Sequence, residues 1–156
     1  MSEERLIAGL LDGMPPPGQV PVSFGNQEVG DEDISILLSA ARVAPSADNA
    51  QIWRFITVRD PEKKRRLGEA AGEGMAGAFS RASVVMVACG VRFIVTRTRK
   101  EQPFAVVDVP IGLLQILLQA RELNLSFTWT LDCDEPAVRK ALGIPQDVRV
   151  VSMVAF

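Results

Sequence analysis

Apolar residues recur at helical spacing in two segments near the start of the chain. A first helix is predicted over residues 2–12, with one apolar side formed by Leu6, Ile7, Leu10 and Leu11. Residues 14–30 include three consecutive prolines and predict an extended segment. A second helix is predicted from residue 31, because three acidic residues occupy its first turn, and it ends before Pro45. Its buried face is predicted to hold Ile34, Leu37, Leu38 and Ala41.

The rest of the chain alternates predicted strands and helices. Apolar and β-branched runs predict strands at residues 52–59, 83–93, 126–132 and 148–156. Acidic caps followed closely by proline predict helices over residues 60–72 and 134–143. Residues 72–82 are rich in glycine and alanine and predict a loose helix or a turn. This order predicts one α+β or α/β domain over residues 1–156, in which residues 1–30 form an N-terminal helix and extended segment.

Residues 104–125 form the most apolar segment of the chain and predict a long helix. Its polar residues fall at spacings of seven, four and three positions, which places them in one narrow stripe. These residues are Asp108, Gln115, Gln119 and Glu122. A helix that is apolar elsewhere is buried nearly all round, so the segment lies either between subunits or at the centre of the core.

Composition and charge narrow the classes of protein. The chain has 156 residues, of which 47% are hydrophobic and 23% charged, and a net charge of -2. The excess of apolar residues favours an oligomer, and the charge makes nucleic acid an improbable partner. The basic run at residues 63–66 is interpreted as a solvated face. We expect a cytoplasmic protein, because the acidic N-terminus is no signal peptide and no apolar stretch reaches membrane-spanning length.

Candidate catalytic chemistry is limited by missing residue types. The chain contains no histidine and no tyrosine, which excludes Ser-His and Cys-His catalysis and a histidine-ligated metal. Cys89 and Cys133 lack CxxC spacing and are interpreted as two reduced, mostly buried thiols rather than a disulfide or metal site. If the protein is an enzyme, a cofactor supplies the chemistry.

The segment APSADNAQIWRF, residues 44–55, joins the second helix to the first strand. Ser46, Asp48 and Asn49 are polar residues typical of turns, where their side chains satisfy loop backbone groups. The alternative is a loop built to hold a ligand. Loop chemistry alone does not separate the two interpretations.

The order of these features resembles the nitroreductase family of flavin enzymes. Members carry an APS-x-x-N-x-Q-P-W-x-F loop after an early helix, and residues 44–55 match it except at Ile52, which replaces proline. Residues 104–129 are similar to the family's long central helix and its exit, with matches at Asp108, Ala120 and Trp129. Residues 134–156 resemble its penultimate helix, LGIP turn and last strand. The resemblance covers about residues 29–156.

The resemblance implies a fold and an activity. The expected fold is an α+β three-layer domain with a mixed, mainly antiparallel central sheet flanked by helices. Two copies would form a homodimer that binds FMN at the subunit interface. The implied reaction is hydride transfer from NAD(P)H to the flavin and then to a small acceptor such as a nitroaromatic or a quinone. This reaction needs no protein acid or base, so no catalytic side chain is predicted.

The resemblance also implies which residues bind the cofactor. They are Pro45, Ser46, Ala47, Asn49, Gln51, Thr128 and Trp129. Ser46 and Asn49 would hydrogen-bond the flavin or its ribityl chain, and Thr128 and Trp129 would lie near the ring. Gln51, together with Trp53, is expected to support the loop rather than touch the flavin.

Three features depart from the family pattern. Residues 18–24 contain no basic residue where members carry arginines that grip the FMN phosphate. The chain stops at Phe156, before the family's GYP turn and its basic phosphate contact. Glu73 falls where relatives place an asparagine near the flavin pyrimidine, and a carboxylate there would oppose negative charge on reduced flavin.

These departures leave a second function open. A degenerate member could keep the dimeric fold, bind no FMN and act as a binding or partner subunit. A basic segment at residues 92–100 either supplies the missing phosphate contact or is a solvated loop. Its cations are Arg92, Arg97, Arg99 and Lys100.

Overall fold

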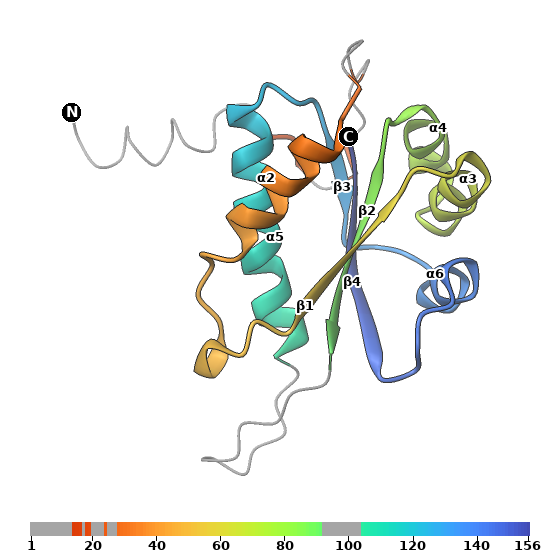
Figure 1. Ribbon diagram of the computed structural model, residues 1–156. Helices are drawn as coiled ribbons and strands as arrows, with labels where there is room; N and C mark the ends of the chain where they lie inside the picture. The colour runs from red at the N-terminus through yellow and green to blue at the C-terminus, as the bar shows by residue number, and fades with distance from the viewer. Residues whose placement is uncertain (1–13, 17, 20–23, 25–27, 92–103) are drawn as a thin grey trace.

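A central sheet with helices on both faces forms a three-layer domain in the computed structural model (Figure 1). The structure describes residues 14–16, 18, 19, 24, 28–91 and 104–156. Helices α2 (Asp31–Ala41) and α5 (Ala105–Glu122) cover one face of the sheet. Helices α3 (Pro61–Ala70), α4 (Glu73–Arg81) and α6 (Glu135–Leu142) cover the other.

The sheet has the order β1-β2-β4-β3. Its strands are β1 (Trp53–Val58), β2 (Val85–Val91), β3 (Thr128–Thr130) and β4 (Val148–Ala155). The two central strands, β2 and β4, are covered by helices on both faces, which explains the unbroken apolar run of β2 and the buried second half of β4. The α+β layered class is confirmed. All strand pairs within the described residues are antiparallel, so the parallel pairing that a mixed sheet requires is not found among them.

From residue 31 onward, the predicted elements match the observed ones in order, with differences in their type or bounds. Residues 73–81 form a regular helix, because Met75, Ala78 and Phe79 follow helical spacing and all three are buried. Helix α5 begins one residue later and ends three residues earlier than predicted. The predicted helix at residues 2–12 and the basic segment at residues 92–100 lie outside the described residues.

The core consists of one cluster on each side of the sheet. The first joins α2 and α5 to the sheet and includes Leu37, Leu113 and Phe156. The second lies beneath α3, α4 and α6 and includes Leu67, Phe79 and Met153. The sheet therefore holds two helical layers that do not share a core.

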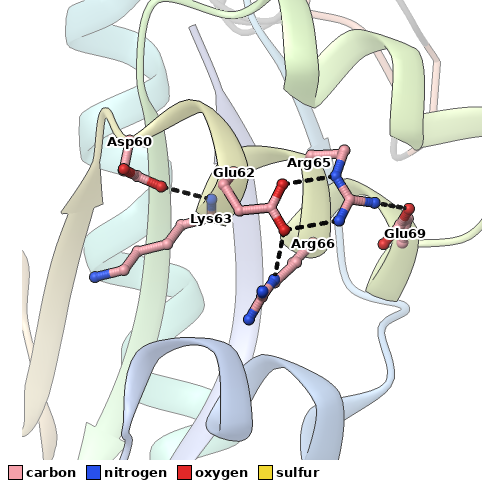
Figure 2. Close-up of polar contacts among 6 residues, drawn as sticks. All are labelled: Asp60, Glu62, Lys63, Arg65, Arg66 and Glu69. Carbon is pink, nitrogen blue, oxygen red and sulfur yellow. Dashed lines mark hydrogen bonds and ion pairs between the residues drawn. The ribbon is translucent and has the colours of Figure 1, made fainter.

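The basic run of helix α3 is largely neutralised within the helix. Arg65 pairs with Glu62 and Glu69, and Arg66 pairs with Glu62 at 2.9 Å (Figure 2). Hydrogen bonds from Arg65 and then Arg66 lower the pKa of Glu62 to about 2. Lys64 is buried and donates from Nζ to the Ala82 carbonyl at 2.5 Å. Arg65 and Arg66 thus lie on a solvated face, as interpreted from the sequence, whereas Lys64 of the same run is buried.

Candidate functional site

The loop between α2 and β1 is held in an unusual backbone conformation. A short 3₁₀ turn, η1 (Ala47–Asn49), follows the extended residue Ser46. Asp48, Asn49 and Gln51 all have positive φ, at 49°, 54° and 45°. Such conformations cost about 1–3 kcal/mol each for residues other than glycine. The loop keeps this shape only because its surroundings stabilise it.

Hydrogen bonds that involve side chains stabilise the loop. The Ala47 N–H donates to Asp108 Oδ2 on α5 at 3.1 Å. The Gln51 N–H donates to Ser46 Oγ at 3.0 Å, and Gln51 Nε2 donates to the Arg42 carbonyl at 2.9 Å. Gln51 therefore ties the far end of the loop back to the end of α2, which agrees with the supporting position expected for it.

The loop presents polar groups at its outer side. Asp48 and Asn49 are exposed. The backbone N–H of Asn49 donates to the Ser46 carbonyl at 3.0 Å, whereas its side-chain amide has no hydrogen-bond partner among the residues that the structure describes. Ser46 is half-buried and uses its oxygen as an acceptor, so its hydroxyl hydrogen can still donate. Pro45 is exposed and Ala47 half-buried beside these groups. The loop thus offers both donors and acceptors next to apolar surface, as a planar heterocycle with polar edges requires.

The other two predicted site residues lie on β3, beside the N-terminal segment. Thr128 is fully buried and donates from Oγ1 to the Gln19 carbonyl at 2.6 Å. Trp129 Nε1 donates to the Pro15 carbonyl at 2.9 Å, and the Gly18 N–H donates to the Trp129 carbonyl at 2.8 Å. The described N-terminal residues therefore cover the edge of β3 and satisfy the polar groups of both side chains.

The structure does not bring the loop and β3 together within one chain. They lie at opposite edges of the sheet, because β1 and β3 are separated by two strands. Strand spacing of about 4.8 Å places the two edges roughly 14 Å apart. The strand register also places Trp129 level with Thr57, because Trp129 is opposite Val154, Val154 is opposite Met86 and Met86 is opposite Thr57. Thr57 is near the end of β1 that lies away from the loop. Within one chain, the loop and Trp129 therefore do not line one compact site.

Trp129 lines an apolar pocket of about 510 Å³ on the α5 side of the sheet. Ten residues form its walls: Met14, Val106, Pro110, Leu113, Leu114, Leu117, Trp129, Leu131, Arg149 and Val151. Arg149 supplies the only charged side chain of this lining. The pocket suits an apolar group or a second protein surface rather than a highly charged ligand.

Two polar residues at the loop were not assigned a site role from the sequence. Arg54 NH1 donates to the carbonyls of Trp53 at 2.7 Å and Gln51 at 3.3 Å, which places a cation beside the loop. Asp108 was noted as part of a polar stripe and as a match to the family's central helix, without a role at the site. The signal that could have found it is a single carboxylate in the apolar first turns of a helix. Glu73 begins α4 and is exposed in the opposite helical layer, so it does not approach the loop of its own chain.

Neither thiols nor metal ligands form a second site. Cys89 is buried and Cys133 half-buried, and both are free, as expected. Burial raises the pKa of the Cys89 thiol to about 11 and also raises the pKa of Cys133. Among the described residues, no three Cys, Asp or Glu side chains are grouped as metal ligands, and no helix is long and apolar enough to cross a membrane.

The fold and the loop together define a nitroreductase-type α+β domain. The model of the nitroreductase family matches residues 23–156, and the chain belongs to that family. A protein of Archaeoglobus fulgidus with the provisional name NADH dehydrogenase/NAD(P)H nitroreductase is 34% identical over 137 residues, which cover 85% of this chain and 76% of that protein. The family expected from the sequence is confirmed.

Solved structures agree with this fold. A nitroreductase family protein from Clostridium novyi has a TM-score of 0.78 and 20% identity, covering 99% of this chain and 83% of the other. An FMN-dependent nitroreductase from Clostridium difficile has a TM-score of 0.75 and 23% identity, covering 88% and 80%. At these identities the structural likeness establishes the fold, which is nitroreductase-like as predicted. The chain is thus an oxidoreductase of nitroreductase type.

Proposed function

We propose that the chain is an FMN-dependent oxidoreductase that takes hydride from NAD(P)H and passes it to a small acceptor such as a nitroaromatic or a quinone. The main observation behind this proposal is the strained loop at residues 44–51. On its exposed side, the Asn49 side chain has no hydrogen-bond partner among the described residues. The names of the relatives support nicotinamide as the donor, and one structural neighbour is FMN-dependent. The cytoplasmic location expected from the sequence stays a prediction.

The loop fits the polar edge of a flavin ring. Ser46 and Asn49 would donate hydrogen bonds to the ring edge and accept hydrogen bonds from it. Pro45 and Ala47 would form the apolar surface of the binding site next to the ring. Bound FMN would supply the hydride chemistry, which the chain's own side chains lack because histidine and tyrosine are absent. The protein would bind the ring, orient it and keep water from one side. Gln51 would act through the loop backbone rather than by touching the ring.

The complete site requires a homodimer. Residues of the loop from one chain and Trp129 from the other would face the same flavin, because one chain holds them at opposite edges of its sheet. The exposed large apolar side chains in the described part of the chain also favour dimerisation through the layer that contains α2 and α5. All lie on or next to α2, α5 and β3: Ile36, Val43, Val106, Val107, Leu114 and Leu131. A second copy would cover this surface.

Thr128 is the weakest member of the proposed set. Its side chain is fully buried and its hydroxyl already donates to the Gln19 carbonyl. It would reach a ligand only if the N-terminal segment moved. It is therefore proposed to lie near the ring without a side-chain contact to it.

The second candidate is a family member that keeps the fold and binds no FMN. It is favoured by the lack of any basic residue at positions 18–24, which leaves the phosphate dianion without charge-assisted partners there. Arg54 is the described cation that lies against the loop, and its NH1 group is engaged by two carbonyls.

Purified protein separates the two candidates. Its visible spectrum is recorded, the flavin is released and quantified, and NAD(P)H is added to the intact protein. About one FMN per chain, bleached by NAD(P)H, supports the oxidoreductase. A colourless protein that neither takes up added FMN nor quenches its fluorescence contradicts it and favours the partner subunit.

A further inference from the structure

Asp108 is a buried carboxylate in an otherwise apolar part of α5. It is 2% exposed, and its neighbours along the helix include Val106, Val107 and Val109. A carboxylate in such a place loses its hydration and persists only with a compensating partner. The partner that the structure gives it is the Ala47 N–H, at 3.1 Å from Oδ2.

This bond differs from the other side-chain bonds of the loop. Ser46 and Gln51 tie the loop to residues five and nine positions away, within the same stretch of chain. Asp108 is 61 positions from Ala47 and belongs to another helix. It links the loop to helix α5, whereas the Gln51 carbonyl accepts from Arg54 of β1, the strand that follows the loop directly. The Asp108 bond fixes the position of the loop relative to α5, whereas the bonds of Ser46 and Gln51 fix the conformation of the loop itself.

Ala47 is the first residue of the 3₁₀ turn, so its N–H has no partner within the turn. The next residues are the ones with positive φ, Asp48 and Asn49. A donor satisfied at this point anchors the strained part of the loop at its start. Without the carboxylate, the Ala47 N–H is unsatisfied and the loop is free to relax away from α5.

We infer that Asp108 is a positioning residue for residues 44–51, here called the cofactor loop. By fixing this loop, Asp108 keeps Ser46 and Asn49 where they meet the flavin. The inference rests on the proposed function. Asp108 acts through the Ala47 N–H and is not assigned a contact with the flavin. The role requires the acceptor oxygen of Asp108 rather than its negative charge. An amide oxygen at the same position would therefore accept the Ala47 N–H equally well.

Four variants test the inference. Asp108→Ala removes the acceptor, and Asp108→Asn keeps an oxygen acceptor of the same size. Ala47→Pro removes the donor and leaves Asp108 in place, and Ser46 already has the extended backbone that a following proline demands. Gln115→Ala is the matched control, since Gln115 belongs to the same polar stripe of α5 and, within the described part of the chain, makes no hydrogen bond to the loop.

Two quantities are measured on each full-length variant. The first is the Kd of apoprotein for FMN, from quenching of flavin fluorescence. The second is amide hydrogen exchange of a peptide covering residues 44–52. We expect Asp108→Ala and Ala47→Pro to weaken FMN binding about tenfold and to speed exchange in the loop peptide. Asp108→Asn and Gln115→Ala stay close to wild type in both measurements.

The outcomes separate this inference from the proposed function. Wild-type protein that binds no FMN contradicts the proposed function, and the exchange data alone then decide the role of Asp108. Loop exchange that is unchanged in Asp108→Ala overturns the inference. An Asp108→Asn variant as impaired as Asp108→Ala also overturns it, because the charge rather than the acceptor then carries the effect. If Asp108→Ala does not fold, Ala47→Pro and Asp108→Asn give the same comparison.

Discussion

Trp53 packs directly against the backbone of Gly112, since a Cβ on that glycine would lie 3.1 Å from Cδ2 of the indole. Gly112 is four residues after Asp108 on α5, so the two positions share one face of the helix. Asp108 holds the start of the cofactor loop and Gly112 receives the tryptophan that follows its end. One face of one helix therefore fixes both ends of the loop.

Replacing Trp53 should be among the most destabilising single changes in this layer. The side chain is 7% exposed, and Trp53→Ala leaves a large cavity against α5. We expect a loss of about 3–5 kcal/mol in the free energy of unfolding, measured by urea denaturation. Val43→Ala is the control, because Val43 is 78% exposed and its truncation should change stability by less than about 0.5 kcal/mol. Equal effects of the two changes would contradict the packing described for Trp53.

Two glycines are expected to respond to alanine with opposite signs. A Cβ on Gly90 in β2 would lie 2.5 Å from the Ala105 Cβ, so Gly90→Ala forces α5 away from the sheet and should cost about 1–3 kcal/mol. Gly74 in α4 has nothing within 4 Å of the same position. Gly74→Ala should therefore stabilise the protein by about 0.4–1 kcal/mol. Thermal unfolding of both variants checks the pair, and a stabilised Gly90→Ala would refute the close approach of β2 and α5.

The sequence predicts the layers better than it predicts the site. Strands β2 and β4 and helix α5 are recognisable because their apolar patterns are set locally by burial. The loop motif predicts a binding role for Ser46 and Asn49, but it does not reveal the bond between Asp108 and Ala47, because the two residues are 61 positions apart and only the fold brings them together. The separation of the loop from Trp129 likewise depends on strand order, which no local pattern encodes.

The thiols should make stability depend on pH in the alkaline range. Burial raises the pKa of Cys89 from 9.0 to about 11, so the folded state retains a proton that the unfolded state loses. Unfolding then releases protons between these values, and the free energy of unfolding falls as pH rises through this window. Below pH 9 the contribution is fully present. Cys89→Ala should flatten the dependence between pH 9 and pH 11, measured by urea denaturation at stepped pH.

The same shift predicts slow reaction of Cys89 with thiol reagents in folded protein. A rise of about two pKa units lowers the thiolate fraction near pH 8 about a hundredfold, and burial blocks access as well. Cys133 is half-buried and should react first. Mass spectrometry after timed alkylation gives the order, and rapid labelling of Cys89 in native protein would contradict its position in the core.

A charge placed on the exposed face of α5 tests the proposal that two chains together form the flavin site. Val107 is 55% exposed although it lies in an apolar turn of that helix, so Val107→Asp should leave the monomer folded while preventing a second copy from covering it. Analytical ultracentrifugation should show a dimer for wild type and a monomer for the variant. Flavin content should fall in the monomeric variant, because the proposed site takes the loop from one chain and Trp129 from the other.

Ser80→Asp is the control for this change, since Ser80 is exposed on α4 in the opposite helical layer. It should leave both mass and flavin content unchanged. A Val107→Asp monomer that keeps its full flavin content would show that the site is complete within one chain. In that case Trp129 is not part of the site, and the loop with its neighbours on α5 binds the cofactor alone.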